Sequence, residues 1–130
     1  MERTGLSLLI YRDGEVVFSS ASGGIRPLLD AIDGLSRDET RGSIVADKIV
    51  GRAAALLTVY MEAAEVHAAL ISTTAKEVLR RHGLSLHFAR EVQVIKSREG
   101  VTICPFERLV QEVSDPEEAY EKIKAKMAEF

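Results

Sequence analysis

The stretch "GSIVADKIVGRAAALLTVYMEAAEVHAALIS" (42–72) decides the fold, because it alternates between two kinds of apolar pattern. Residues 42–47 and 65–72 are short runs of the kind found in buried strands, whereas 48–63 is rich in alanine and long enough for a helix. A strand, a helix and a strand in this order predict a β-α-β unit. Its right-handed crossover makes the two strands parallel.

A hairpin is predicted upstream of this unit. The runs "LSLLIY" (6–11) and "EVVFSS" (15–20) are rich in β-formers, and Asp13 and Gly14 lie between them. Asp-Gly favours a tight hairpin because both residues adopt positive φ at low cost. The segment "IRPLLDAI" (25–32) then predicts a helix, and a polar loop separates it from the β-α-β unit.

Downstream, the strand and helix pattern continues. "TTAKEVLRRHG" (73–83) predicts a helix in which Thr74 and Glu77 form a capping box, "LSLHF" (84–88) predicts a strand, and "VQVIK" (92–96) predicts a further short one. Two helices then close the chain. The apolar positions of the first are Phe106, Leu109, Val110 and Val113; those of the second are Ala119, Ile123 and Met127, after an N-cap at Ser114 or Asp115.

Together these elements predict one domain over residues 1–130. Its fold class is α/β, a three-layer α/β/α sandwich with a mixed sheet that opens with an antiparallel hairpin. A chain of 130 residues is long enough to bury roughly two-thirds of the surface of its unfolded state.

The composition excludes several classes of function. A net charge of −3 with scattered basic residues argues against a nucleic-acid-binding protein. The longest apolar run, within 53–64, is interrupted by Glu62 and is too short to span a membrane. The single cysteine cannot form an internal disulfide, which fits a reducing compartment, and we expect a cytoplasmic protein.

Candidate site residues follow from where ligands bind in such sheets, beyond the carboxyl ends of the strands and near helix N-termini. Three strand-to-helix junctions satisfy this condition. The ligand-binding candidates are Ser22, Gly23, Gly24, Lys48, Gly51, Arg52 and Pro105, and the catalytic candidates are Cys104, Asp47 and Glu107.

Each candidate also has a purely structural interpretation. Ser22, Gly23 and Gly24 suit a simple turn. Asp47 is a natural N-cap for a helix that begins at Lys48. On that helix Lys48 and Arg52 would lie one turn apart and repel each other, so that a bound anion would neutralise both.

Cys104 has two interpretations. It is either a small apolar residue in a packed position or a thiol whose thiolate is stabilised at a helix N-terminus. The second interpretation needs a base within hydrogen-bond reach, for which Asp47, Glu107 or a histidine is available.

No metal site or cofactor is expected from the histidines. His67, His82 and His87 lack the spacings H-x-x-x-H or H-x-x-E-H, and there is no second cysteine. They are interpreted as partly buried, hydrogen-bonded residues.

Three motifs in order, "GGIRPLLD" (23–30), "DKIVGRAAALL" (47–57) and "ICPFERLV" (103–110), resemble a family catalogued only as a domain of unknown function. Its members are assigned the cytidine-deaminase-like fold, and the resemblance runs from the hairpin to about residue 113. The resemblance implies that architecture and a cleft between the second and third motifs.

The resemblance does not carry the zinc chemistry of that fold. Zinc deaminases have H-A-E or C-A-E at the first of these helices and P-C-x-x-C at the next. This chain has "VGRAAA" (50–55) at the first position and a Cys104-Pro105-Phe106-Glu107 segment at the second. Zinc-dependent deamination is therefore not expected, and the cleft is either reused, with Cys104 as its wall or nucleophile, or vestigial.

Three functions remain open at this stage. The first is a zinc-free protein of the deaminase fold that binds a small anionic, nucleotide-like metabolite through Lys48 and Arg52. The second is a thiol-dependent enzyme with Cys104 as nucleophile. The third is a non-catalytic homo-oligomer, associated through the alanine-rich helix (52–64) or the C-terminal helix. Whether the protein is an enzyme is left open.

Overall fold

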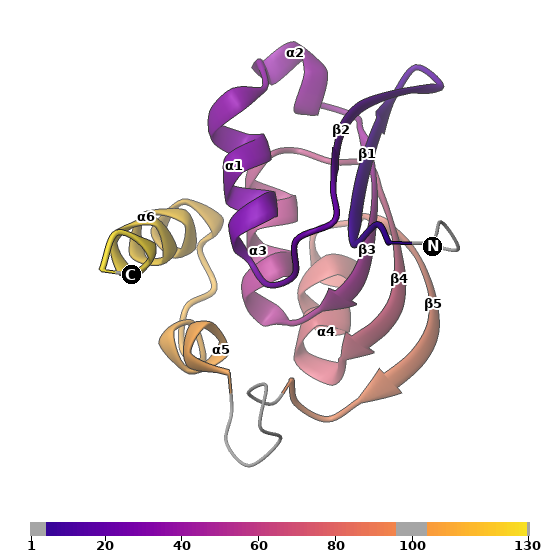
Figure 1. The fold of residues 1–130 in the computed structure, drawn as a ribbon. Coiled ribbons are helices and arrows are strands. Elements are labelled where there is room, and N and C mark those ends of the chain that lie inside the picture. The colour runs from indigo at the N-terminus through magenta and orange to yellow at the C-terminus, as the bar shows by residue number, and fades with distance from the viewer. Residues whose placement is uncertain (1–4, 96–103, 130) are drawn as a thin grey trace.

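The computed structural model describes residues 5–95 and 104–129, which form a five-stranded sheet and six helices (Figure 1). The strands are β1 (Leu8–Arg12), β2 (Glu15–Ser20), β3 (Ile44–Val50), β4 (Glu65–Ser72) and β5 (Ser85–Val92). The helices are α1 (Arg26–Gly34), α2 (Arg37–Thr40), α3 (Arg52–Tyr60), α4 (Thr73–Arg81), α5 (Pro105–Leu109) and α6 (Pro116–Met127).

The sheet is mixed, with the strand order β2-β1-β3-β4-β5. β1 runs antiparallel to both β2 and β3, whereas β3, β4 and β5 are parallel to one another. The parallel strands are joined by α3 and α4, as the β-α-β pattern predicted. The expected α/β class, with a mixed sheet that opens with an antiparallel hairpin and is flanked by helices, is confirmed.

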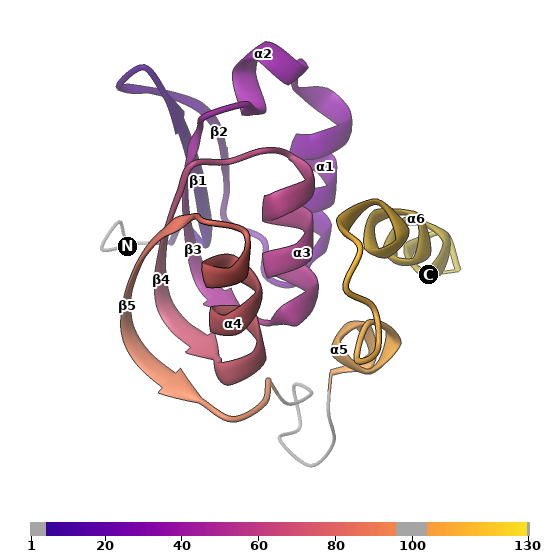
Figure 2. The ribbon, with the colours of Figure 1, turned by 180° about the vertical axis from the view of Figure 1, so that it is seen from behind.

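The layers can be followed in two opposite views (Figures 1 and 2). Both draw α1, α3 and α4 against one face of the sheet, and α5 and α6 beyond α3. We call the opposite face of the sheet, on which no described helix lies in these views, the outer face. The main core lies between the sheet and the helices, and it includes fully buried residues of β1, β3, β4 and α3.

Helix α3 is the centre of this core. Its residues from Ala53 to Thr58 are all buried, and it packs against α1, α4 and α6. Alanine in the first turns lets these neighbours approach closely. Most of the surface of the alanine-rich helix is therefore used inside the chain, and an oligomer interface on this helix stays a prediction.

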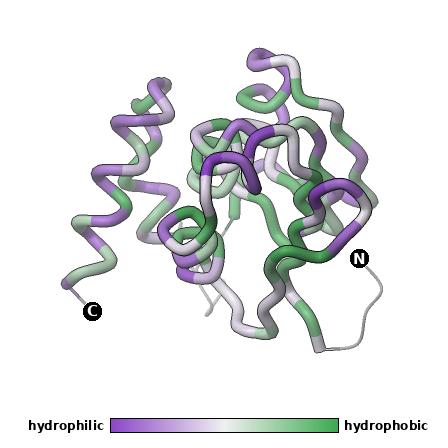
Figure 3. Tube along the Cα trace, turned by 90° about the horizontal axis from the view of Figure 1, so that it is seen from above, coloured by the Kyte–Doolittle hydropathy of each residue, from purple (hydrophilic) through white to green (hydrophobic). Residues whose placement is uncertain are grey.

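Helix α6 is attached to this core by one apolar stripe. Its N-cap is Asp115, whose side chain accepts a hydrogen bond from the Glu118 N–H at 3.1 Å. Figure 3 shows green and purple alternating along the helix near the C-terminus. At the α1 side, Tyr120 stacks on Tyr60 with 4.4 Å between ring centroids, and its hydroxyl donates to Asp33 at 2.6 Å. The predicted inward positions Ala119, Ile123 and Met127 are indeed buried.

The opening hairpin turns at the predicted dipeptide. Asp13 and Gly14 have φ of 54° and 80°, which are the left-handed conformations that a tight two-residue turn requires. An irregularity in register between Ile10 and Tyr11 adds to the twist of the two strands.

Several boundaries differ from the sequence prediction. β3 extends to Val50, so that α3 begins at Arg52 and not at Lys48. β5 is one long strand up to Val92; residues 93–95 are not a strand, and position 96 lies outside the described residues. The N-cap of α4 is Ser72, whose hydroxyl accepts from the Ala75 N–H at 3.1 Å, so the predicted capping box is wrong.

In β3 and β4, the alternation of side chains between the two faces of the sheet is interrupted once. Val45 and Val50 are both buried in the main core, although strict alternation would place residues an odd number apart on opposite faces. The shift leaves Ile49, which is 52% exposed, on the outer face. Its register partner Leu70 behaves in the same way, because the next residue, Ile71, is buried.

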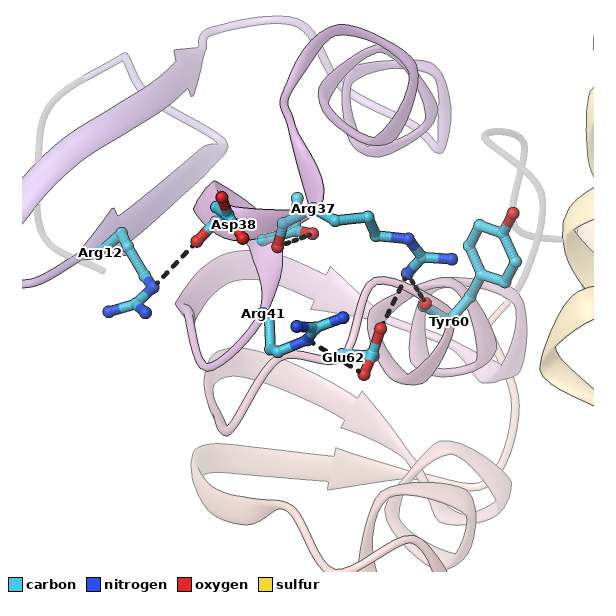
Figure 4. Close-up of polar contacts among 7 residues, drawn as sticks. Arg12, Arg37, Asp38, Arg41, Tyr60 and Glu62 are labelled. Carbon is cyan, nitrogen blue, oxygen red and sulfur yellow. Dashed lines mark hydrogen bonds and ion pairs between the residues drawn. The ribbon is translucent and has the colours of Figure 1, made fainter.

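The polar loop before β3 contains the short helix α2, which is fastened to the end of α3 (Figure 4). Arg37 donates to the carbonyl of Tyr60 at 2.8 Å and to Glu62 at 3.2 Å, and Arg41 lies 3.5 Å from the same carboxylate. Glu62 holds this position in a left-handed turn with φ of 65°. On the other side, Arg12 of β1 donates to the Asp38 carbonyl at 3.3 Å.

Among the described residues, no helix is both long and apolar enough to cross a bilayer.

Candidate functional site

The N-terminus of α3 is occupied by a side chain from α5. The Arg52 N–H donates to Glu107 Oε1 at 2.7 Å, and the Ala53 N–H donates to Oε2 at 2.8 Å. Burial raises the pKa of the Glu107 carboxyl, while these two hydrogen bonds and the charge of Arg52 oppose the rise. The carboxylate thus satisfies two of the free N–H groups of the helix and lies at the positive end of its dipole.

Gly51 makes this arrangement sterically feasible. A Cβ at this position would lie 2.5 Å from Cδ and Oε2 of Glu107. The backbone there is extended, with φ of −96° and ψ of −176°, which any residue can adopt. The glycine is therefore needed for space and not for an unusual conformation.

The Arg52 side chain is also used within the chain. Its Nε donates to the Val110 carbonyl at 2.9 Å, and its Nη2 donates to the Val113 carbonyl at 2.6 Å. Glu107 and Arg52 therefore join α3 to α5 and to the turn after it. Arg52 and Glu107, which the sequence offered to a ligand, are therefore both used for contacts within the chain.

Asp47 lies in β3, where it pairs in register with the buried residues Leu8 and Ala68. Burial raises the pKa of its carboxyl from the ordinary 3.8 to about 7, and hydrogen bonds from the backbone N–H groups of Ile49 and Lys48 oppose the rise. Asp47 does not cap α3, because the residue before that helix is Gly51. The predicted N-cap is corrected accordingly.

The raised pKa of Asp47 predicts that the stability of the folded chain depends on pH. The folded state binds this proton more tightly than the unfolded chain does, so the free energy of unfolding decreases as the pH rises from about 4 to about 7. Asp47→Asn should therefore leave stability nearly unchanged near pH 3.5, where Asp47 is mostly protonated in both states, and increase it by about 2 kcal/mol near pH 8.5, below the full linkage value because solvent reaches part of the residue. Urea unfolding at both pH values measures this.

Asp30→Asn is the matched control, because Asp30 is exposed on α1. Its stability should follow that of the wild type at both pH values. A wild-type stability that increases between these pH values relative to Asp47→Asn would contradict the predicted sign.

The remaining predicted residues lie apart from this junction or at its edge. Lys48 is exposed in β3, and its backbone N–H donates to the Ser7 carbonyl at 3.0 Å. The segment 22–24 is an exposed loop between β2 and α1, and Ser22 accepts a hydrogen bond from the Ser7 hydroxyl. Pro105 is exposed at the start of α5.

Cys104 precedes α5 and is partly buried. Its N–H donates to the Ile95 carbonyl at 3.1 Å, and its carbonyl accepts from the Arg108 N–H at 3.0 Å. Neither Asp47 nor Glu107 is hydrogen-bonded to the thiol among the described residues. The structure thus brings Gly51, Arg52 and Glu107 together and places Cys104 at the edge of that group.

A hollow of about 550 Å³ lies at the carboxyl end of the parallel strands. Its lining is mainly apolar and comes from all three parallel strands and from the segment that follows β5: Ile49, Leu70, Val92, Gln93, Val94 and Ile95. Ile95 also connects this hollow to Cys104 through the backbone hydrogen bond described above. The hollow is therefore at the sheet edge where the sequence predicted a ligand, but other residues line it.

Arg90 of β5 is a cation on the strand next to a residue that lines this hollow. It pairs in register with Leu70. The following residue, Glu91, binds Thr73 and Lys76 of α4 at 2.9 and 2.7 Å, so that Arg90 emerges on the outer face. Arg90 is exposed and makes no ion pair with any described residue.

A comparison with known families assigns the chain. The sequence profile of a family described as "Domain of unknown function (DUF1893)" matches residues 1–127. The chain belongs to the DUF1893 family. A search of the curated proteins gives no match.

A solved DUF1893 structure has the same fold. The crystal structure of the DUF1893 family protein TM1506 from Thermotoga maritima matches this chain with a TM-score of 0.85 and 35% sequence identity. The match covers 93% of this chain and 80% of that chain. The family description names no activity, so function must be argued from the residues.

Two features of this DUF1893 chain escaped the sequence analysis. Arg90 was not singled out, although a cation in the second half of a predicted edge strand is a signal that could have found it. The histidine spacing was tested only for motifs within one segment. In the structure His67 and His87 lie in register on adjacent strands, with Glu65 beside them, whereas His82 is exposed at the end of α4.

Proposed function

We propose that this DUF1893 protein binds a small anionic molecule of nucleotide-like chemistry at the carboxyl end of β3, β4 and β5. The observation that supports this proposal is the apolar hollow together with Arg90, which pairs in register with the lining residue Leu70 and makes no ion pair with any described residue. A planar apolar group would be sheltered by Ile49, Leu70 and the segment after β5, while Arg90 would meet the negative charge. Guanidinium groups suit phosphate and carboxylate because they donate two parallel hydrogen bonds.

The proposed place differs from the one that the sequence suggested. The N-terminus of α3 is not available to a ligand, because the Glu107 carboxylate already accepts its N–H groups. Lys48 remains exposed in β3, one residue before Ile49, and can add a second positive charge near the hollow. The anionic ligand is thus retained, with Arg90 in place of Arg52.

The proposal keeps the deaminase-like fold but not its zinc chemistry. Where zinc deaminases hold their metal, this chain offers Cys104 and Glu107. Both Glu107 oxygens accept backbone hydrogen bonds, and Arg52 of α3 lies where a first ligand would be needed. These residues do not fit a zinc ion, so we propose binding without deamination.

Thermal-shift screening tests this function. Nucleoside monophosphates and sugar phosphates should raise the melting temperature of the wild type, whereas the uncharged nucleosides should raise it less. Arg90→Ala should weaken binding of the best compound by about tenfold, the equivalent of one charge-assisted hydrogen bond. Arg81→Ala is the matched control, since Arg81 is exposed at the end of α4.

The outcomes separate clearly. A flat response of the wild type to all anionic compounds would overturn the proposal. Equal losses for Arg90→Ala and Arg81→Ala would show general attraction of anions and would also contradict it. A response that Ile49→Trp abolishes, by filling the hollow, would support it.

Association of two copies is a second candidate. The observation in its favour is that Ile49 and Val94, at the rim of the hollow, are 52% and 42% exposed. Light scattering of the wild type and of Ile49→Glu tests this. A monomer at working concentration would remove the candidate.

A further inference from the structure

We propose that Glu65, His67 and His87 form a binding site for a divalent transition metal of the zinc, nickel and cobalt class. The site is separate from the proposed ligand hollow, because Glu65 begins β4 while Leu70 lies near its carboxyl end. It is also separate from Cys104 and Glu107, which come from the α5 segment.

Strand geometry places the three side chains on one face. Glu65 and His67 are two residues apart on β4, and successive side chains of a strand alternate between faces. His87 of β5 is the register partner of His67. Because Val66 between them is fully buried in the main core, all three side chains belong to the outer face.

The possible ligand atoms converge on one point. Glu65 Oε2 lies 2.5 Å from Nε2 of His67 and 3.8 Å from Nε2 of His87. One ligand atom from each residue lies within 4.8 Å of the other two. Ligands around a tetrahedral zinc ion, at about 2.0–2.1 Å from the metal, lie roughly 3.3 Å apart, so the stacked rings would rotate to direct both nitrogens at one ion.

The two imidazole rings lie side by side on adjacent strands. Their ring centroids are 4.6 Å apart with an angle of 16° between planes. Two imidazoles held this close on adjacent strands can both reach one ion, and the Glu65 carboxylate lies beside them.

The register neighbours of Glu65 and His67 on the adjacent strands carry no positive charge. In register on β3, the neighbours of His67 and Glu65 are Ala46 and Ile44, and the neighbour of Glu65 on β5 is Ser85. The side chains of Glu65, His67 and His87 are 31%, 42% and 59% exposed, so an ion can enter from solvent and keep water at its open positions.

The donor set determines the class of metal. Imidazole nitrogen favours zinc, nickel, cobalt and copper, whereas magnesium and calcium prefer all-oxygen sites. Two histidines and one carboxylate also leave at least one coordination position open, in contrast to closed structural zinc sites. We therefore expect exchangeable binding and no requirement of the metal for folding.

The test uses the full chain without a histidine tag. Cobalt(II) is titrated while its visible absorption is recorded, and zinc is then added to displace it. The wild type should bind both metals, and His67→Ala, His87→Ala and Glu65→Gln should each bind cobalt at least about tenfold more weakly. Magnesium should give no response.

Two control variants isolate the site. His82→Ala removes the third histidine, and Cys104→Ser removes the only thiol; both should bind cobalt like the wild type. NMR of the histidine ring protons in the wild type gives a readout that needs no variant, since zinc should shift the signals of His67 and His87 and leave those of His82 in place.

Three results would overturn the proposal. The first is a wild type that binds no zinc or cobalt at millimolar concentration. The second is unchanged affinity in His67→Ala or His87→Ala. The third is loss of binding in Cys104→Ser, which would place the metal near α5. None of these results bears on Arg90 and the hollow, so failure here is distinct from failure of the proposed function.

Discussion

Glu107→Ala should lower the free energy of unfolding by about 4 kcal/mol. The substitution leaves the N–H groups of Arg52 and Ala53 without acceptors in the contact between α3 and α5, and each such group costs about 1–3 kcal/mol. It also removes a negative charge from the positive end of the α3 dipole. Urea unfolding followed by circular dichroism measures the difference.

The control for this prediction is Glu112→Ala, because Glu112 is an exposed carboxylate in the same part of the chain. It should change stability by less than about 0.5 kcal/mol. Glu107→Gln keeps one carbonyl acceptor, so its free energy of unfolding should lie between those of the wild type and Glu107→Ala. Equal stability of the wild type and Glu107→Ala would show that water replaces the carboxylate at no cost.

Gly51→Ala should lower the free energy of unfolding by about 3 kcal/mol for a steric reason. The new Cβ would lie 2.5 Å from the Glu107 carboxyl group, and the buried position leaves little room for that group to move. Either α5 shifts outward or the two hydrogen bonds to α3 break. Thermal and urea unfolding both report the loss.

Gly34→Ala is the matched control for the steric argument. An added Cβ at Gly34 has no neighbour within 4 Å, and the residue ends α1 without a positive φ. Its stability should stay within about 0.5 kcal/mol of the wild type.

A double-mutant cycle tests the cause of the Gly51→Ala effect. In a Glu107→Ala background the clash is absent, so Gly51→Ala should then cost less than about 1 kcal/mol. Equal costs in both backgrounds would show that the effect does not involve Glu107.

The sequence predicted the fold where local patterns determine it. Asp13-Gly14 specifies a turn with two positive φ values, and the alternation of β-type and helical runs between 42 and 88 specifies the parallel strands and their helices. The apolar residues Ala119, Ile123 and Met127 are spaced four apart, which favours one face of a helix, and they are the buried residues of α6. In these segments, the local preference and the packing agree.

The boundary between β3 and α3 could not be read from the same signals. Lys48, Ile49 and Val50 precede Gly51 and suit either a strand or the first turn of a helix. The strand is favoured because β3 pairs with β4 as far as Val50 and Ile71. Only these pairings with a distant segment settle the boundary, and they also remove the apparent helical spacing of Lys48 and Arg52.

The candidate site was predicted only in part, again because contacts between distant segments determine it. Gly51, Arg52 and Glu107 were identified as chemically notable, and they do meet. Their roles reversed, because the anion expected from solution is a carboxylate from another helix. The pair His67 and His87 depends on the register of two strands, which no spacing within one segment reveals.

The Glu107 carboxylate competes with dissolved anions for the N–H groups at the start of α3. A carboxylate held on the same polypeptide acts at an effective concentration of roughly millimolar or above. A dissolved phosphate present at micromolar levels is therefore excluded from the amides of Arg52 and Ala53 by mass action. Only an event that pulls α5 away from α3 would free those amides for an incoming molecule.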